Sequence, residues 1–185
     1  MPALTVEKKK FTYEDYLNTP DDKRYELIEG ELLMTPSPVP YHQWIVTNIG
    51  SELREFIKTN KLGKVFLAPC DVHLDDETIL EPDVLFISKD RLNIIGEKNV
   101  QGAPDLIVEV LSEGTAYRDL VKKKKLYAKF GVKEYWIVDP SEKTVEIFNN
   151  KDAVFILEKT YTQNDILESP LMSELKIKLS EVFEY

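Results

Sequence analysis

The sequence predicts a mixed α/β fold, in which helices flank a mixed β-sheet. Two observations carry this prediction. A strand, a helix and a strand follow one another over residues 106–138, which implies a right-handed parallel crossover. Short apolar segments separated by turn residues precede and follow this unit, as in hairpins and meanders. No repeat, linker or low-complexity stretch divides the 185 residues, so we expect a single domain over residues 1–185.

The first predicted elements are a short helix and a β-hairpin. Residues 12–17 begin with Thr-Tyr-Glu-Asp, the pattern of a capping box, which predicts a helix there. Residues 24–34 carry two apolar stretches on either side of Glu29 and Gly30. This arrangement predicts a hairpin that turns at those two residues.

Helical spacing continues over residues 41–59. Apolar side chains recur there at intervals of three and four and form one stripe: Val46, Ile49, Leu53 and Ile57. His42 lies one turn before Val46 on the same stripe. We therefore expect His42 to point inward at the start of this helix.

Several short segments bounded by Gly, Pro or Asp are predicted strands: residues 65–68, 72–74, 78–87 and 106–111. The last of them is almost continuously apolar, which is typical of a strand buried on both faces. Residues 91–101 fit either a helical turn or a loop.

The C-terminal part of the crossover and a meander complete the predicted sheet. A helix is expected over residues 119–130, with Gly131 at the usual position just past a helix end. A strand over residues 134–138 follows, and an Asp-Pro-Ser-Glu turn leads back into a strand over residues 144–148. Residues 154–158 are expected to add an edge strand.

Composition narrows the class of protein. A single cysteine, Cys70, excludes an intramolecular disulfide and a multi-cysteine zinc site. No apolar run approaches the ~18 residues that a membrane span needs, and the chain start has no signal-peptide apolar stretch. We therefore expect a cytoplasmic protein without membrane contact, whose residues 1–10 form a solvated leader.

The charge distribution bears on nucleic acid as a partner. The chain has 33 acidic and 24 basic residues, a formal charge of −9, whereas phosphate neutralisation needs Lys and Arg. Between Arg118 and Lys133, however, seven basic residues stand against one acidic residue. The negative total therefore does not exclude DNA, which could meet this basic helix.

Two carboxylates stand out because of their apolar surroundings. Glu109 lies amid Leu-Ile-Val before it and Val-Leu after it, where an uncompensated charge would cost several kcal/mol. Asp83 begins the apolar stretch Val-Leu-Phe-Ile, directly after Pro82. If the two strands are neighbours, both carboxylates can converge on one oxygen-lined point, which suits Mg²⁺ or Mn²⁺. The alternative for Glu109 is a solvated strand face or a structural pair with a lysine.

The lysine run at residues 122–125 offers a cation for the same point. Four successive helix positions sweep roughly 300°, so at least one lysine must lean toward the protein. The mean direction of the larger apolar residues on this helix falls almost on Lys123, and Lys124 is the second choice. Such a lysine could hold an attacking water or neutralise charge on a phosphoryl group.

Four segments also carry a family resemblance. They are Tyr25-Glu-Leu-Ile-Glu-Gly-Glu-Leu, Glu81-Pro-Asp-Val, Gly102-Ala-Pro-Asp-Leu-Ile-Val-Glu-Val-Leu-Ser and Gly131-Val-Lys-Glu-Tyr-Trp-Ile-Val-Asp. In this order they resemble the Uma-type restriction endonucleases, a bacterial family within the PD-(D/E)XK nuclease superfamily. The resemblance runs from about residue 11 to the C-terminus.

The resemblance implies a restriction-endonuclease-like core that binds a divalent metal and cleaves a phosphodiester bond. The metal-binding aspartate of the family falls on Asp83 and its glutamate on Glu109. The superfamily pattern has a lysine two residues after the glutamate, and this chain has Leu111 there. The lysine of this family is moved to the following helix, where it falls on Lys123.

Three further residues occur in family-like positions. His42 is either a satisfied core histidine or a member of the site. Glu26 and Glu31, in the predicted hairpin, are candidates for a supporting or third-carboxylate role.

Together these features favour a metal-dependent endodeoxyribonuclease, in which Asp83 and Glu109 hold Mg²⁺ or Mn²⁺ and Lys123 orients the attacking water. A homodimer is expected because nucleases of this type that cut both strands are often dimers. The alternative is a non-catalytic nuclease-fold module that binds DNA or a protein partner. Paired carboxylates can also cleave glycosidic bonds, but nothing in the sequence favours that reaction.

Overall fold

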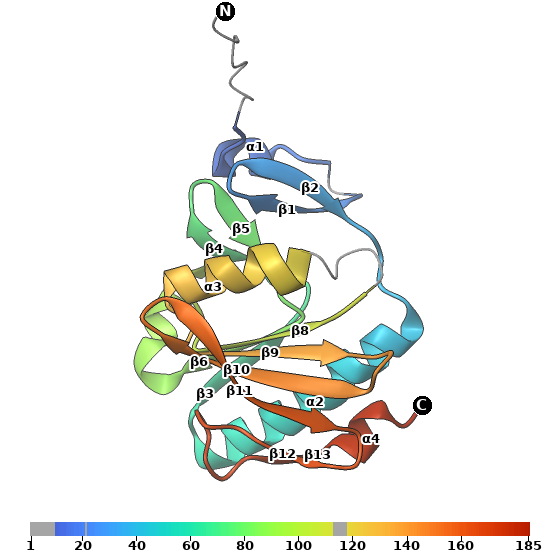
Figure 1. Cartoon of the computed structure of the whole chain (residues 1–185). Coiled ribbons are helices and arrows are strands. Elements are labelled where there is room, and N and C mark those ends of the chain that lie inside the picture. Colours follow the sequence, from blue (N-terminus) through green and yellow to red (C-terminus); the bar gives the residue numbers. More distant parts are fainter. Residues whose placement is uncertain (1–9, 21, 113–117) are drawn as a thin grey trace, which may run out of the picture.

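A computed structural model describes residues 10–20, 22–112 and 118–185, so the expected leader lies almost wholly outside the described residues. The larger of two main sheets has six strands in the order β11-β10-β9-β8-β6-β3 (Figure 1). In chain order these are β3 (Gly63–Leu67), β6 (Val84–Ser88), β8 (Leu106–Val110), β9 (Glu134–Asp139), β10 (Thr144–Lys151) and β11 (Val154–Thr162). Strands β8 and β9 are parallel and the other pairs antiparallel, which confirms a mixed sheet and the predicted crossover.

The smaller sheet has five strands in the order β2-β1-β5-β4-β7. Its members are β1 (Arg24–Ile28), β2 (Glu31–Thr35), β4 (Val72–Asp75), β5 (Thr78–Leu80) and β7 (Val100–Gln101). Strands β1 and β2 form the predicted hairpin, and both of its turn residues have positive φ, 52° at Glu29 and 83° at Gly30. A second, separate sheet was not predicted.

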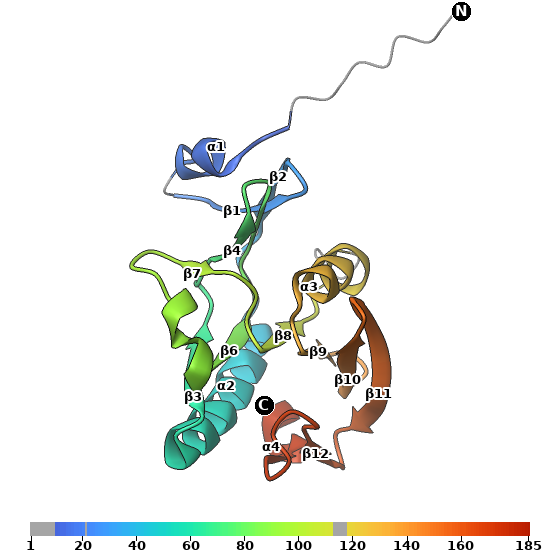
Figure 2. The ribbon, with the colours of Figure 1, turned by 90° about the vertical axis from the view of Figure 1, so that its left-hand side faces the viewer.

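Helices cover both faces of the larger sheet (Figures 1 and 2). Helix α2 (Pro40–Asn60) lies on one face, and α3 (Lys124–Phe130) lies on the other, between the two main sheets. Helix α1 (Tyr13–Leu17) begins with the predicted capping box. The predicted apolar stripe of α2 is buried, and so is His42. None of the helices in the described ranges is long and apolar enough to cross a membrane.

Strand β8 lies between two apolar layers. Leu106, Val108 and Val110 pack in the layer that contains the buried side of α2. Ile107 packs in the layer that contains α3. Because side chains alternate along a strand, Glu109 lies on the α3 side, buried between helix and sheet.

The prediction of one strand over residues 78–87 is wrong, because the chain changes sheets within it. Strand β5 ends at Leu80 in the smaller sheet, and β6 begins at Val84 in the larger one. Pro82 has no N–H group to donate to a ladder, and the N–H of Glu81 donates to Glu26 Oε1 at 3.0 Å. The break therefore places Asp83 at the junction of the two sheets.

The predicted helix over residues 119–130 has an unexpected first half. Residues Arg118–Lys123 form π-helical turns, and α3 proper begins at Lys124. Gly131 follows in the left-handed conformation with φ 91°, as predicted. Leu120 and Val121 are exposed, so only the second half of this segment presents its apolar residues to the sheet.

The remaining segments differ from the predictions mainly in length. The expected edge strand is the nine-residue β11, and residues 91–101 contain parts of a 3-10 helix (Lys89–Ile94) and of β7. The chain ends in three elements without a prediction: β12 (Ile166–Glu168), β13 (Lys176–Lys178) and α4 (Leu179–Phe183). Buried Glu134 on β9 anchors this region by accepting hydrogen bonds from Ser169 Oγ and Leu171 N. Burial raises the pKa of Glu134.

We expect Gly131→Ala to lower the free energy of unfolding by about 1 kcal/mol, because a Cβ strains the left-handed conformation that ends α3. No neighbouring atom within 4 Å would clash with that Cβ, so the effect isolates backbone strain. Gly131→Asn is the matched control, since asparagine tolerates this conformation better. Urea unfolding measures both variants, and equal stability of the two would contradict the assignment.

Candidate active site

A cavity of about 590 Å³ lies where the two sheets meet the start of α2. Part of its wall is the linker between β2 and α2, and another part is the turn after β9. Its charged and ionisable lining comes from separate elements: Arg24, His42, Glu81, Asp83, Glu109 and Lys123. The cavity is therefore lined by all three residues that the sequence analysis proposed as catalytic: Asp83, Glu109 and Lys123.

Strand pairing brings the two proposed metal ligands together. Strands β6 and β8 are antiparallel neighbours in which Val84 pairs with Val108. Asp83 directly precedes β6 and Glu109 lies within β8, and both line the cavity. The condition set by the sequence, that the two strands be neighbours, is confirmed.

Two groups hold the Asp83 carboxylate. Its Oδ2 accepts a hydrogen bond from the N–H of Val110 at 2.8 Å and lies 3.4 Å from His42 Nε2. The same histidine nitrogen lies 2.9 Å from the carbonyl oxygen of Val110. Asp83 Oδ1 accepts no hydrogen bond from residues in the described ranges, so one carboxylate oxygen is available for a ligand. His42 thus belongs to the site by position.

Lys123 joins two buried carboxylates. Its Nζ lies 2.8 Å from Glu26 Oε1 and 3.2 Å from Glu109 Oε1. Lys123, Glu26 and Glu109 are only 4%, 1% and 2% exposed, so the ion pairs are shielded from water. The expectation that Lys123 leans inward is confirmed. Lys123 also supplies the positive charge that a buried Glu109 carboxylate requires.

Tyr127 is a further partner of Glu109. The residue lies one helical turn after Lys123 and is fully buried, and its hydroxyl donates to Glu109 Oε1 at 2.7 Å. Burial, together with the neighbouring Glu109 carboxylate, raises the pKa of Tyr127 well above its ordinary value. The hydroxyl therefore stays protonated and acts as a donor. Tyr127 was given no role in the sequence analysis, and its i+4 spacing from Lys123 was the available signal.

Arg24 and Glu81 form a second charged pair at the cavity. Arg24 donates from Nε and Nη2 to Glu81 Oε2, at 2.9 and 2.7 Å. Burial raises the pKa of Glu81, and Arg24 opposes this shift. Sequence reasoning gave neither residue a role. The only signal was the position of Glu81 two residues before Asp83.

Three of the candidate residues lie away from the cavity lining: Glu26, Glu31 and Lys124. Glu31 pairs with Lys122, with 3.1 Å between Oε2 and Nζ. Lys124 places its ammonium 3.3 Å from the centre of the Phe148 ring, and burial lowers its pKa. The supporting role of Lys124 and the third-carboxylate role of Glu31 are therefore not supported, whereas Glu26 contacts Lys123 directly.

Three basic residues of the segment over residues 118–133 pair within the protein. Besides Lys122 and Lys123, Lys133 pairs with buried Asp105 at 2.7 Å. Lys125 and Lys129 remain exposed. The expectation that DNA meets this helix stays a prediction.

The oxygen-rich lining fits a hard divalent cation that keeps most of its water ligands. Asp83 and Glu109 supply carboxylate oxygens to the lining of one cavity. Within the described ranges, no three His, Cys, Asp or Glu side chains form a ready metal site. Mg²⁺ often uses only one or two carboxylates, with waters and substrate phosphates completing its octahedron. The four carboxylates Glu26, Glu81, Asp83 and Glu109, against Arg24 and Lys123, give a formal −2 that favours a cation.

Comparisons with known proteins agree with this fold. The chain is similar to a crystal structure described as a putative nuclease belonging to DUF820 from Anabaena variabilis ATCC 29413. The two are 21% identical with a TM-score of 0.76, and the match covers 94% of this chain and 97% of that one. No curated protein matched the chain.

The family comparison covers most of the sequence. Residues 12–180 match Uma2, a family described as putative restriction endonuclease. This range contains both main sheets and every described residue of the cavity. The chain therefore belongs to the Uma2 family of putative restriction endonucleases.

Proposed function

We propose that this protein is a Mg²⁺- or Mn²⁺-dependent endonuclease that hydrolyses phosphodiester bonds of DNA at the cavity. One observation carries the proposal: Asp83, Glu109 and Lys123 line the same cavity, where the Lys123 ammonium lies 3.2 Å from Glu109. Membership of a family described as putative restriction endonucleases supports DNA as the substrate.

Asp83 and Glu109 would hold the metal ion in the cavity. A divalent ion bound there would lower the pKa of a bound water and stabilise charge on the phosphate. The Val110 N–H and His42 keep Asp83 oriented, while Tyr127 and Lys123 keep Glu109 oriented. Preformed ligands of this kind reduce the reorganisation that binding requires.

Lys123 would position the attacking water. An ammonium group has three N–H donors, and Lys123 borders the cavity beside Glu109. A water held between Lys123 and Glu109 would therefore be oriented toward a phosphate in the cavity. Glu26 fixes the lysine from the other side, which makes Glu26 a positioning residue.

One observation favours the alternative of a non-catalytic module that binds DNA or a protein. Lys123 forms ion pairs with both Glu26 and Glu109, as expected of a purely structural charge cluster. Metal binding separates the two functions, because a structural cluster needs no ion. A homodimer and a cytoplasmic location stay predictions.

Purified protein should cleave supercoiled plasmid DNA with Mg²⁺ or Mn²⁺ and not with EDTA. We expect Asp83→Asn and Glu109→Gln each to reduce the cleavage rate by about 100-fold or more, since each removes a charged ligand. Asp90→Asn and Glu142→Gln are exposed controls with the same chemical change. Cleavage that survives both site variants would refute the assignment.

Metal should also stabilise the folded protein. A ligand that binds only the native state at about 100 times its Kd adds about 2.7 kcal/mol, or about 5–10 °C in Tm. We expect this rise for wild type and a smaller one for Asp83→Asn, measured by scanning calorimetry. An unchanged wild-type Tm would favour the non-catalytic module.

Lys123→Met should lower both stability and cleavage. Two buried carboxylates then lose their cation, which costs about 3–5 kcal/mol in the free energy of unfolding. The cleavage rate should fall by about 100-fold or more. Lys125→Met, at an exposed position of the same helix, is the control.

A second variant separates the two effects. Lys123→Met combined with Glu26→Gln removes one buried charge and should recover part of the lost stability. Cleavage should remain low, because the water still lacks its donor. Recovery of cleavage together with stability would show that Lys123 acts only on folding.

A further inference from the structure

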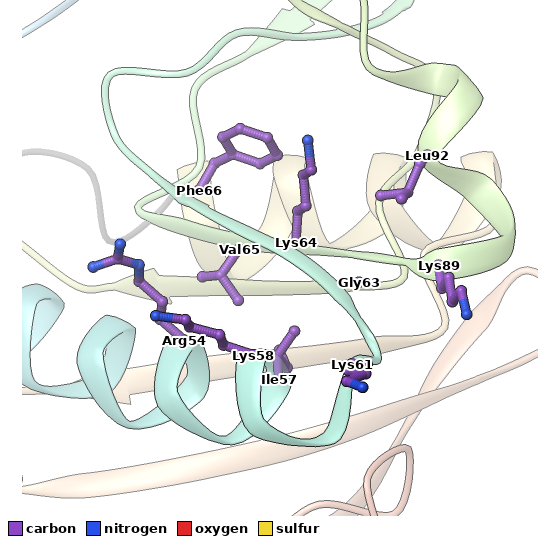
Figure 3. Close-up of a pocket in the computed structure, with 10 residues that line it drawn as sticks. All are labelled: Arg54, Ile57, Lys58, Lys61, Gly63, Lys64, Val65, Phe66, Lys89 and Leu92. Carbon is purple, nitrogen blue, oxygen red and sulfur yellow. The ribbon is translucent and has the colours of Figure 1, made fainter.

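A second cluster of cations lies at the far end of α2 from the cavity. It surrounds a hollow of about 400 Å³ whose lining includes five basic residues, here called the basic end: Arg54, Lys58, Lys61, Lys64 and Lys89 (Figure 3). They come from α2, the turn after it, β3, and the residue that follows β6. All five are exposed, and none forms an ion pair with a residue in the described ranges.

An unpaired basic cluster is unexpected in a chain with a formal charge of −9. Lys58 and Lys61 can be explained by the negative end of the α2 dipole, which favours cations in the last turn. The helix dipole does not explain Arg54, Lys64 or Lys89, which lie outside the last turn of α2. Figure 3 shows the charged groups spread around the hollow, with Arg54 and Lys58 on one side and Lys89 on the other. Such a spread suits a chain of anionic groups better than a single small anion.

The exposed surface of α2 links the cavity to the basic end. Gln43, Thr47, Ser51, Arg54 and Lys58 follow at intervals of three and four residues, so they form one stripe on the helix. All five are exposed, and the exposed acidic residues Glu52 and Glu55 of the same helix lie beside the stripe. The stripe begins at the residue after His42, which lines the cavity. Gln, Ser and Thr side chains commonly bind phosphate oxygens, as do Arg and Lys.

The spacing of the two ends suits duplex DNA. From His42 to Lys58 a helix rises about 24 Å, and from Asp83 to Lys89 an extended strand spans about 20 Å. At 3.4 Å per nucleotide of one strand, these lengths correspond to about six or seven phosphates. A duplex with its cleaved phosphate in the cavity would thus reach the basic end with its flanking backbone.

We propose that the basic end and the α2 stripe bind the phosphate backbone of duplex DNA about six base pairs away from the cleaved bond. This inference rests on the proposed nuclease function, since it concerns the same substrate. It moves the main electrostatic contact from the helix after β8 to α2. Lys58, Lys64 and Lys89 neutralise phosphates without any role at the bond that is cut.

The test compares two triple variants with the same charge change. One is Lys58→Gln, Lys64→Gln and Lys89→Gln in the basic end. The other, the control, changes three exposed lysines elsewhere: Lys125→Gln, Lys129→Gln and Lys151→Gln. Binding to labelled DNA is measured by fluorescence anisotropy in EDTA at several salt concentrations, so binding is read without cleavage. The probes are a duplex of about 24 base pairs and a hairpin with a stem of about five, too short to span both sites.

We expect the basic-end triple to bind the long duplex about tenfold more weakly or worse, with a salt slope smaller by about two to three. The control triple should change the affinity by about twofold or less, and the short stem should bind all three proteins alike. Equal weakening by both triples, no weakening by the basic-end triple, or no binding of the long duplex by wild type would overturn the proposal.

Cleavage of the short stem with Mg²⁺ tests the proposed nuclease function separately. The basic-end triple should cut this stem at the wild-type rate. If wild type binds the long duplex through the basic end but cuts neither probe, the nuclease assignment fails while the binding surface stands.

Discussion

The paired charges of Lys123, Glu26 and Glu109 are the interaction on which the site depends. Glu26 belongs to the smaller sheet and Glu109 to the larger one, and Lys123 ends the π-helical turns between β8 and α3. One ammonium group therefore connects three parts of the fold that are distant in sequence. Removing any one of these charges would leave another buried without full compensation, so folding and the geometry of the site are coupled. Tyr127 extends this network by a hydrogen bond to Glu109 and ties the following turn of the helix to the same point.

The change of sheet between β5 and β6 is the second constraint. Pro82 interrupts what would otherwise be one apolar strand, and the backbone of Glu81 bonds to Glu26. Asp83 follows directly, at the start of β6, which is an antiparallel neighbour of β8. This short segment therefore connects β5 of the smaller sheet to β6 of the larger one, and its Asp83 carboxylate lines the cavity. His42 reaches that carboxylate from the opposite layer, at the first turn of α2.

Some basic residues form ion pairs within the protein, and others are exposed without such partners in the described ranges. Three lysines of the segment after β8 have internal partners, which are Glu31, Glu109 and Asp105. The cations at the end of α2 have no such partners in the described ranges. A count of basic residues along the chain cannot tell a paired lysine from an exposed one.

Local pattern by itself determined the capping box of α1, the Glu29-Gly30 turn, the buried stripe of α2 and the glycine that ends α3, since each depends on neighbours within one or two turns. It also singled out Glu109 and the inward direction of Lys123, because charges within apolar segments need partners. Only the tertiary structure decided that Glu26, rather than Glu31, completes the pair, that Tyr127 donates to Glu109, and that Asp83 and Glu109 line one cavity. These contacts join residues from separate elements, and their geometry depends on strand register and sheet choice, which short-range patterns do not specify.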